Sequence, residues 1–213
     1  MKQLQIFVFG DSITYGAWDI EGGWVAQLRK FLDEKRLADP DKYEFIVYNL
    51  GISGNDTYDL LERFEFEIKQ RLDKEMETIV VFAIGENDAQ FIHSQNSLRT
   101  TPDMYQANLQ KLLKKAQAFT SKIVFVGLTP ANEPKTTPIP WNKDKSYTNA
   151  NIAQHSKVLQ SFCKENKIPL IDFFNKWLST HYLQFLDADG LHPNSEGHQK
   201  IYEAVKPILL KYL

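Results

Sequence analysis

Residues 4–14 read LQIFVFGDSIT, an apolar segment that ends at a glycine and continues into short polar residues. Residues 4–9 are rich in the aromatic and β-branched side chains that favour strands, so we expect a β-strand there. Gly10, Asp11 and Ser12 then follow the carboxyl end of that strand. In open parallel α/β sheets, ligands bind beyond the carboxyl ends of the strands. This stretch therefore predicts both the first strand of a sheet and the position of a functional edge.

The rest of the chain alternates between strand-like and helix-like segments. Residues 78–84 are nearly all apolar, as expected of a strand that is covered on both faces. Such a βαβ rhythm predicts an α/β fold, with a parallel sheet between helices. No internal repeat or linker divides residues 1–213, so we expect one domain. The other predicted strands cover 44–49, 122–128 and 168–172, and the predicted helices cover 23–37, 58–72, 149–166 and 195–212, with one more that begins at Thr101-Pro102.

Composition gives no sign of a nucleic-acid or membrane partner. Hydrophobic residues make up 43% of the 213 residues and charged residues 24%, with a net charge of −2. This balance is typical of a globular protein and offers no basic surface for nucleic acid. No segment approaches the length of a membrane span, and the N-terminus lacks a secretory leader pattern. We therefore expect a cytoplasmic protein without integral membrane association, whereas its oligomeric state is not predicted.

Polar residues collect after the other predicted strands as well. Gly51-Ile52-Ser53-Gly54-Asn55 follows the second strand, and Gly85-Glu86-Asn87-Asp88 follows the third. Asp187-Ala188-Asp189-Gly190-Leu191-His192 comes well after the fifth. Because the carboxyl ends of parallel strands meet at one edge of a sheet, we expect these residues to lie near Ser12.

These segments resemble the motifs of the SGNH, or GDSL-type, hydrolase superfamily. The likeness covers nearly the whole chain and rests on Ser12 in Gly-Asp-Ser, Gly54 after the second strand, Asn87 in Gly-x-Asn-Asp, and Asp189 and His192 in Asp-x-x-His. It implies a flavodoxin-like three-layer α/β/α sandwich with a five-stranded parallel sheet in the order 2-1-3-4-5. It also implies that the oxyanion hole consists of the backbone N–H groups of Ser12 and Gly54 and the side-chain amide of Asn87.

The residue types suit acyl transfer. A serine hydroxyl becomes a strong nucleophile only when a base takes its proton, and His192 can be that base for Ser12. Asp189 precedes His192 by three residues, so a tight turn can bring its carboxylate against the other ring nitrogen. Asp187 is an alternative partner for this histidine. Alternatively, Ser12 could be a helix N-cap and His192 a turn residue bonded to backbone.

Two positions depart from the commonest family pattern. Glu86 stands where a small residue is frequent, and Asn55 is inserted after Gly54, so both could alter the pocket.

A long segment and five aromatic residues are candidates for the walls of a substrate pocket. We expect residues 131–148, which contain several prolines, to form a loop that shapes the substrate site. The pocket candidates, each of which could instead be a packing or loop residue, are Tyr15, Trp18, His93, Trp141 and Tyr147.

The sequence therefore predicts a serine hydrolase that cleaves carboxylic esters or thioesters through an acyl-enzyme. Its substrate would be a small acyl ester, a thioester or an acetylated sugar, and the sequence does not decide among these. An acyltransferase or a catalytically silent binding module on the same fold are the alternatives. We predict no metal and no cofactor, because no histidine pair has metal-ligand spacing and no P-loop or Gly-x-Gly-x-x-Gly motif occurs.

Overall fold

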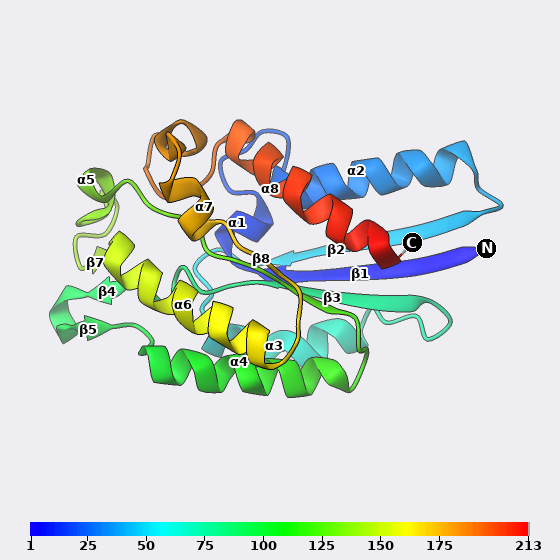
Figure 1. The fold of residues 1–213 in the computed structure, drawn as a ribbon, viewed down its shortest axis with the longest axis horizontal. Coiled ribbons are helices and arrows are strands. Elements are labelled where there is room, and N and C mark those ends of the chain that lie inside the picture. Colours follow the sequence, from blue (N-terminus) through cyan, green and yellow to red (C-terminus); the bar gives the residue numbers. More distant parts are fainter. Residues whose placement is uncertain (213) are drawn as a thin grey trace.

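The computed structural model describes residues 1–212, and Leu213, the last residue of the predicted domain, lies outside the described residues. Within residues 1–212, a five-stranded parallel sheet has the order β2-β1-β3-β6-β8 (Figure 1). Counted along the chain, this is the order 2-1-3-4-5, so the predicted α/β fold and the implied strand order are confirmed. The strands are β1 (Lys2–Gly10), β2 (Tyr43–Gly51), β3 (Glu77–Ala83), β6 (Ile123–Val126) and β8 (Leu170–Ile171).

Helices cover both faces of this sheet and complete a three-layer sandwich (Figure 1). One face carries α2 (Gly23–Ala38) and α8 (Ser195–Leu209). The other face carries α3 (Thr57–Lys69), α4 (Pro102–Gln117) and α6 (Asn149–Glu165). All five correspond to predicted helices. The C-terminal prediction, 195–212, also includes the 3-10 turn η3 (Leu210–Tyr212), because the chain tightens there at the end of α8.

Successive side chains of the central strands point to opposite faces of the sheet, so the hydrophobic core is divided between the two faces. Ile79 and Val81 pack in the cluster that contains α2 and α8, whereas Val80 and Phe82 pack against α3, α4 and α6. All four side chains have an exposed fraction of 0%. The nearly continuous apolar segment of the third strand is thus the consequence of burial on both faces.

The strands end together at one edge of the sheet. Gly10 of β1 lies in register with Gly51 of β2 and Ala83 of β3. A Cβ atom at Gly10 would lie 2.0 Å from the Thr14 Oγ1 atom and 2.3 Å from the Ala83 carbonyl oxygen, so only glycine fits there. The polar segments that follow these strands therefore start side by side, as the sequence predicts.

A second, small sheet lies beyond this edge and differs from the prediction. Residues 131–148, expected to be a loop, contain α5 (Glu133–Thr136) and β7 (Lys145–Ser146). β7 pairs with β4 (Phe91–Ile92), which also pairs with β5 (Ser97–Leu98), and η1 (His93–Gln95) connects β4 to β5. These strands of two residues each are too short to show a periodic pattern in sequence. They lie near the carboxyl ends of the large sheet (Figure 1).

Three further short helices complete the described chain. α1 (Ser12–Tyr15) directly follows β1, and α7 (Phe174–Leu178) and η2 (Tyr182–Phe185) lie between β8 and α8. None of the helices formed by residues 1–212 combines the length and the apolar character needed to span a membrane.

Candidate active site

Ser12 is the first residue of α1, immediately beyond the carboxyl end of β1. The helix is capped by Asp11, whose Oδ1 atom accepts a hydrogen bond from the Ile13 N–H at 2.9 Å. The N-cap alternative for Ser12 is therefore wrong, because the neighbouring aspartate holds that position. The Ser12 hydroxyl instead lies 2.9 Å from the His192 Nε2 atom.

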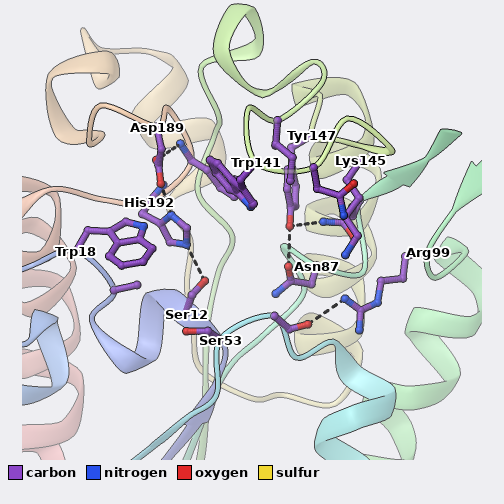
Figure 2. A pocket seen from close by; sticks show the side chains of 16 residues that line it. Ser12, Trp18, Ser53, Asn87, Arg99, Trp141, Lys145, Tyr147, Asp189 and His192 are labelled. Atoms are coloured by element: carbon purple, nitrogen blue, oxygen red, sulfur yellow. Dashed lines mark hydrogen bonds and ion pairs between the residues drawn. The ribbon is translucent and has the colours of Figure 1, made fainter.

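His192 connects Ser12 to Asp189 across its ring (Figure 2). Its Nδ1 atom lies 2.5 Å from the Asp189 Oδ2 atom, while Asp189 Oδ1 accepts the N–H groups of Leu191 and His192 at 2.8 and 3.0 Å. Burial of Asp189 disfavours its charged form, but the hydrogen bonds from His192 and Leu191 outweigh burial and lower the pKa of this carboxyl. The acid is therefore ionised at neutral pH and orients the ring.

The alternative acid, Asp187, contributes its backbone to this turn. Its N–H donates to the His192 carbonyl at 2.8 Å, and its own carbonyl accepts from the Gly190 N–H at 3.0 Å. The structure thus places the side chain of Asp189, three residues before His192, against the ring.

Gly54 and Asn87 line the same cavity as Ser12. Gly54 has φ = +82°, in the left-handed region that glycine adopts without strain, and a Cβ atom there would meet no atom within 4 Å. Its requirement for glycine thus comes from the backbone conformation and not from crowding within the protein. The Asn87 Nδ2 atom donates to the Asn55 carbonyl at 2.9 Å, and its Oδ1 atom accepts from the Tyr147 hydroxyl at 2.7 Å.

Arg99, which sequence reasoning missed, lines the cavity and also holds the Gly54 loop. Its Nη1 atom donates to the Gly54 carbonyl at 2.9 Å. Its Nε and Nη2 atoms lie 2.7 and 2.8 Å from carboxylate oxygens of Asp56 and Asp59. Asp56 and Asp59 also form the capping box of α3, so Arg99 ties the loop to a helix terminus. No local motif marks this arginine, because its partners are about 40 residues away in the chain.

The cavity beside Ser12 has a volume of about 650 Å³. Trp18 and Trp141 lie on either side of His192 (Figure 2), with ring centroids 6.0 and 6.5 Å from that of the histidine. Both side chains are largely exposed, at 71% and 56%. Trp18 also has φ = +66°, an unusual conformation for a bulky residue and one that tends to occur at functional sites. Besides residues already named, the lining includes Ala17, Ser53, Gln90, Ile139, Asn142, Lys145 and Leu191.

Three of the five predicted pocket residues line this cavity and two do not. Trp18, Trp141 and Tyr147 belong to the lining. Tyr15 lies outside the lining and is exposed. His93 also lies outside it, because its Nε2 atom is bonded to the Ser146 hydroxyl at 2.7 Å in the small sheet.

Neither of the two residues that depart from the family pattern, Glu86 and Asn55, belongs to the cavity lining. Glu86 is buried and turned away from the cavity, with its Oε1 atom accepting from the Thr129 N–H at 3.1 Å. Burial, together with the nearby Asp11 carboxyl, raises the pKa of Glu86 well above its usual range. Burial likewise raises the pKa of Asp11 to about 6.

Asn55 accepts a hydrogen bond from the Asn87 side chain through its backbone carbonyl. The Asn55 side-chain oxygen accepts a hydrogen bond from Arg63 Nε at 2.8 Å.

Asp88 fastens the Asn87 turn to the start of α3. Its two carboxyl oxygens accept from the Thr57 N–H at 3.0 Å and from the Thr57 hydroxyl at 2.5 Å. Burial raises the pKa of Asp88 to about 7. Asp88 therefore orders the loop, and the neighbouring Asn87 faces the cavity.

Within residues 1–212, no group of three or more His, Cys, Asp or Glu side chains is arranged to hold a metal ion. The chemistry that the cavity can support is that of a hydroxyl, an imidazole and a carboxylate in a hydrogen-bonded row, with amide donors beside them.

Comparison with protein families agrees with this arrangement. Residues 8–200 match the model of the GDSL-like Lipase/Acylhydrolase family. This region begins in β1 and ends in α8, so it contains each of the segments that surround the cavity.

Individual relatives are similar over nearly their whole lengths. An arylesterase from Vibrio mimicus is 26% identical over 211 residues, which are 98% of this chain and 90% of that protein. The crystal structure of TesA is 27% identical, with a TM-score of 0.70, and the match covers 98% of this chain and 99% of that one. A catalytic mutant of an acetylxylan esterase from Geobacillus stearothermophilus is 25% identical, with a TM-score of 0.68 and coverage of 95% and 92%.

Proposed function

Because the chain belongs to the GDSL-like lipase/acylhydrolase family and is an ester hydrolase of that type, we propose that it cleaves carboxylic esters or thioesters through an acyl-enzyme on Ser12. The observation that carries this proposal is the continuous row from the Ser12 hydroxyl to His192 Nε2, at 2.9 Å, and from His192 Nδ1 to Asp189, at 2.5 Å. The proposed nucleophile is thus within hydrogen-bond reach of the proposed base, and that base is within hydrogen-bond reach of the proposed orienting acid.

In the proposed reaction, Ser12 Oγ attacks the carbonyl carbon of the ester while His192 Nε2 accepts the hydroxyl proton. Asp189 holds the Nδ1–H tautomer and stabilises the imidazolium that forms. His192 then gives the proton to the leaving alcohol or thiol, and the carbon–oxygen or carbon–sulfur bond breaks. Water, activated by the same histidine, hydrolyses the resulting acyl-Ser12 and regenerates the hydroxyl.

The backbone N–H groups of Ser12 and Gly54 and the Asn87 amide are the proposed donors to the negative oxygen of the tetrahedral intermediate. The cavity volume of about 650 Å³ falls in the range of small-molecule sites. A cavity of this size can hold a small ester substrate. The name of the acetylxylan esterase relative points to an acetyl ester as one such substrate, and the exposed tryptophans offer flat apolar surfaces to the rest of the substrate.

We expect a fluorophosphonate probe to label the wild-type protein covalently and to leave Ser12→Ala unlabelled. The reason is that Ser12 Oγ attacks phosphorus while His192 takes its proton, fluoride leaves, and the serine phosphonate that forms stays tetrahedral. The measurement is intact mass, followed by mapping of the modified peptide. Ser53 also lines the cavity, so Ser53→Ala is the matched control and should be labelled like the wild type. A modified peptide that contains Ser53, or folded wild-type protein that takes up no label, would refute the proposal.

We expect Asn87→Ala to lower kcat for p-nitrophenyl acetate about 10²- to 10³-fold, because one oxyanion donor is lost. KM should change by less than about threefold, since this donor acts mainly on the transition state. Steady-state kinetics at neutral pH gives both constants. A rise in KM at constant kcat would instead assign Asn87 to ground-state binding.

A further inference from the structure

Both ends of the Asn87 side-chain amide are held by other parts of the chain. Nδ2 donates to the Asn55 backbone carbonyl at 2.9 Å, and Oδ1 accepts from the Tyr147 hydroxyl at 2.7 Å. A backbone carbonyl can only accept, so Nδ2 must face Asn55 and Oδ1 must face Tyr147. One of the two Nδ2 hydrogens is used by Asn55, and the second remains available to a ligand in the cavity.

Gln90 sets the direction of the Tyr147 hydroxyl. Its Nε2 atom donates to the Tyr147 oxygen at 2.6 Å. A tyrosine hydroxyl has a single hydrogen. If the Gln90 oxygen faced Tyr147 instead, that hydrogen would have to serve both Gln90 and Asn87, and one short oxygen–oxygen contact would have no hydrogen between its atoms. The order that satisfies both contacts runs from Gln90 to Tyr147 to Asn87.

Tyr147 is rigidly placed by the segment that carries it. Its N–H donates to the Thr136 carbonyl at 2.9 Å, and the Thr136 hydroxyl donates to the Tyr147 carbonyl at 2.8 Å. The exposed fractions of Tyr147 and Gln90 are 3% and 2%, so water competes little for these hydrogen bonds. Burial also raises the pKa of Tyr147, and its hydroxyl therefore keeps the hydrogen that it donates.

We propose that Tyr147 is a positioning residue that acts through Asn87, keeping the amide turned so that its free Nδ2 hydrogen points to the oxyanion. This inference rests on the proposed function. Residues 131–148 then have a role besides shaping the cavity. Through Tyr147, this segment orients the amide of Asn87, which lies in the turn after β3. Without the hydroxyl, the amide is held only at Nδ2 by the Asn55 carbonyl, so it can rotate and turn its free Nδ2 hydrogen away from the developing negative charge.

We expect Tyr147→Phe to lower kcat for p-nitrophenyl acetate about 10-fold, the scale of one buried hydrogen bond, with KM changed by less than about twofold. In the Asn87→Ala background the same substitution should change kcat by less than about twofold, because the group that Tyr147 positions is gone. A loss of similar size in both backgrounds would show a general structural role and would overturn the inference. So would an unchanged kcat in Tyr147→Phe alone.

Tyr182→Phe is the matched control. The Tyr182 hydroxyl donates to the Ala131 carbonyl at 3.2 Å and accepts from Asn149 at 3.4 Å, so it bonds the same segment without contacting Asn87. We expect its kcat to stay within about twofold of the wild type. A fall equal to that of Tyr147→Phe would mean that loosening residues 131–148 is sufficient, and would overturn the specific role of Tyr147.

A spectroscopic measurement separates this inference from the proposed function. In ¹⁵N-labelled protein, Tyr147→Phe should shift the side-chain amide signals of Asn87, assigned by their loss in Asn87→Ala, whereas Tyr182→Phe should leave them in place. Unshifted Asn87 signals would overturn the inference even if hydrolysis is intact. Wild-type protein with neither hydrolysis nor labelling at Ser12 would instead refute the proposed function.

Discussion

Alanine at Ser12, at His192, or at both should lower kcat/KM for p-nitrophenyl acetate by nearly the same factor, about 10⁴- to 10⁶-fold. The single variants should each be about as inactive as the double variant. Ser12 Oγ and His192 Nε2 share one hydrogen bond of 2.9 Å, and each is useless to the proposed mechanism without the other. The remaining rate in all three variants would come from the oxyanion donors and from substrate binding. Steady-state kinetics with matched protein preparations measures the three factors.

Exposed residues of the same types provide the controls. Ser179 and His181 are solvent-exposed and lie outside the cavity lining, so Ser179→Ala and His181→Ala should keep kcat/KM within about threefold of the wild type. If the Ser12 and His192 losses multiplied in the double variant, the two residues would act independently. That result would contradict the proposed proton transfer between them.

Much of the fold could be predicted because burial leaves a periodic trace in the sequence. The segments around Ile6 and Val81 are apolar because both faces of the sheet are covered, and the stripe of Leu109, Leu112 and Leu113 marks the inner face of α4. Thr101 accepts from the Met104 N–H and Pro102 opens that helix, as the predicted cap requires. The strand order came from the family resemblance, since periodicity alone does not order parallel strands.

The reactive residues of the candidate site could be predicted because they belong to local motifs, whereas Trp18, Trp141 and Tyr147 were predicted to line the pocket as aromatic residues. Gly10 to Ser12 are contiguous, and Asp189 and His192 are three residues apart. Each group therefore forms a short sequence motif that identifies its residues as candidates. The sequence did not predict Arg99, nor the hydrogen bond between Tyr147 and Asn87, although Tyr147 and Asn87 are both site candidates. Their contacts join segments about 40 and 60 residues apart. Each such contact depends on the small sheet, whose strands of two residues each carry no periodic signal.

Asp189→Asn should lower kcat about 10⁴-fold at neutral pH, while Asp187→Asn should lower it less than about threefold. In the wild type, Asp189 Oδ1 accepts two backbone N–H groups at 2.8 and 3.0 Å, and Oδ2 faces His192 Nδ1. In the asparagine variant, the amide oxygen should remain with the two N–H donors, which turns Nδ2 toward the ring. His192 Nδ1 must then accept, so the ring hydrogen moves to Nε2. A protonated Nε2 cannot take the proton of Ser12, although every atom of the site keeps its place.

This pair of variants tests which aspartate of the turn acts on the histidine. The Asp189 carboxyl contacts the ring at 2.5 Å, so its loss should affect catalysis far more than the loss of Asp187. The tautomer of the ring then distinguishes a change of orientation from the loss of a nearby charge. Nitrogen-15 signals of the His192 ring report this tautomer directly, since the hydrogen should be on Nδ1 in the wild type and on Nε2 in Asp189→Asn. Equal losses of kcat, or an unchanged tautomer, would refute the role proposed for Asp189.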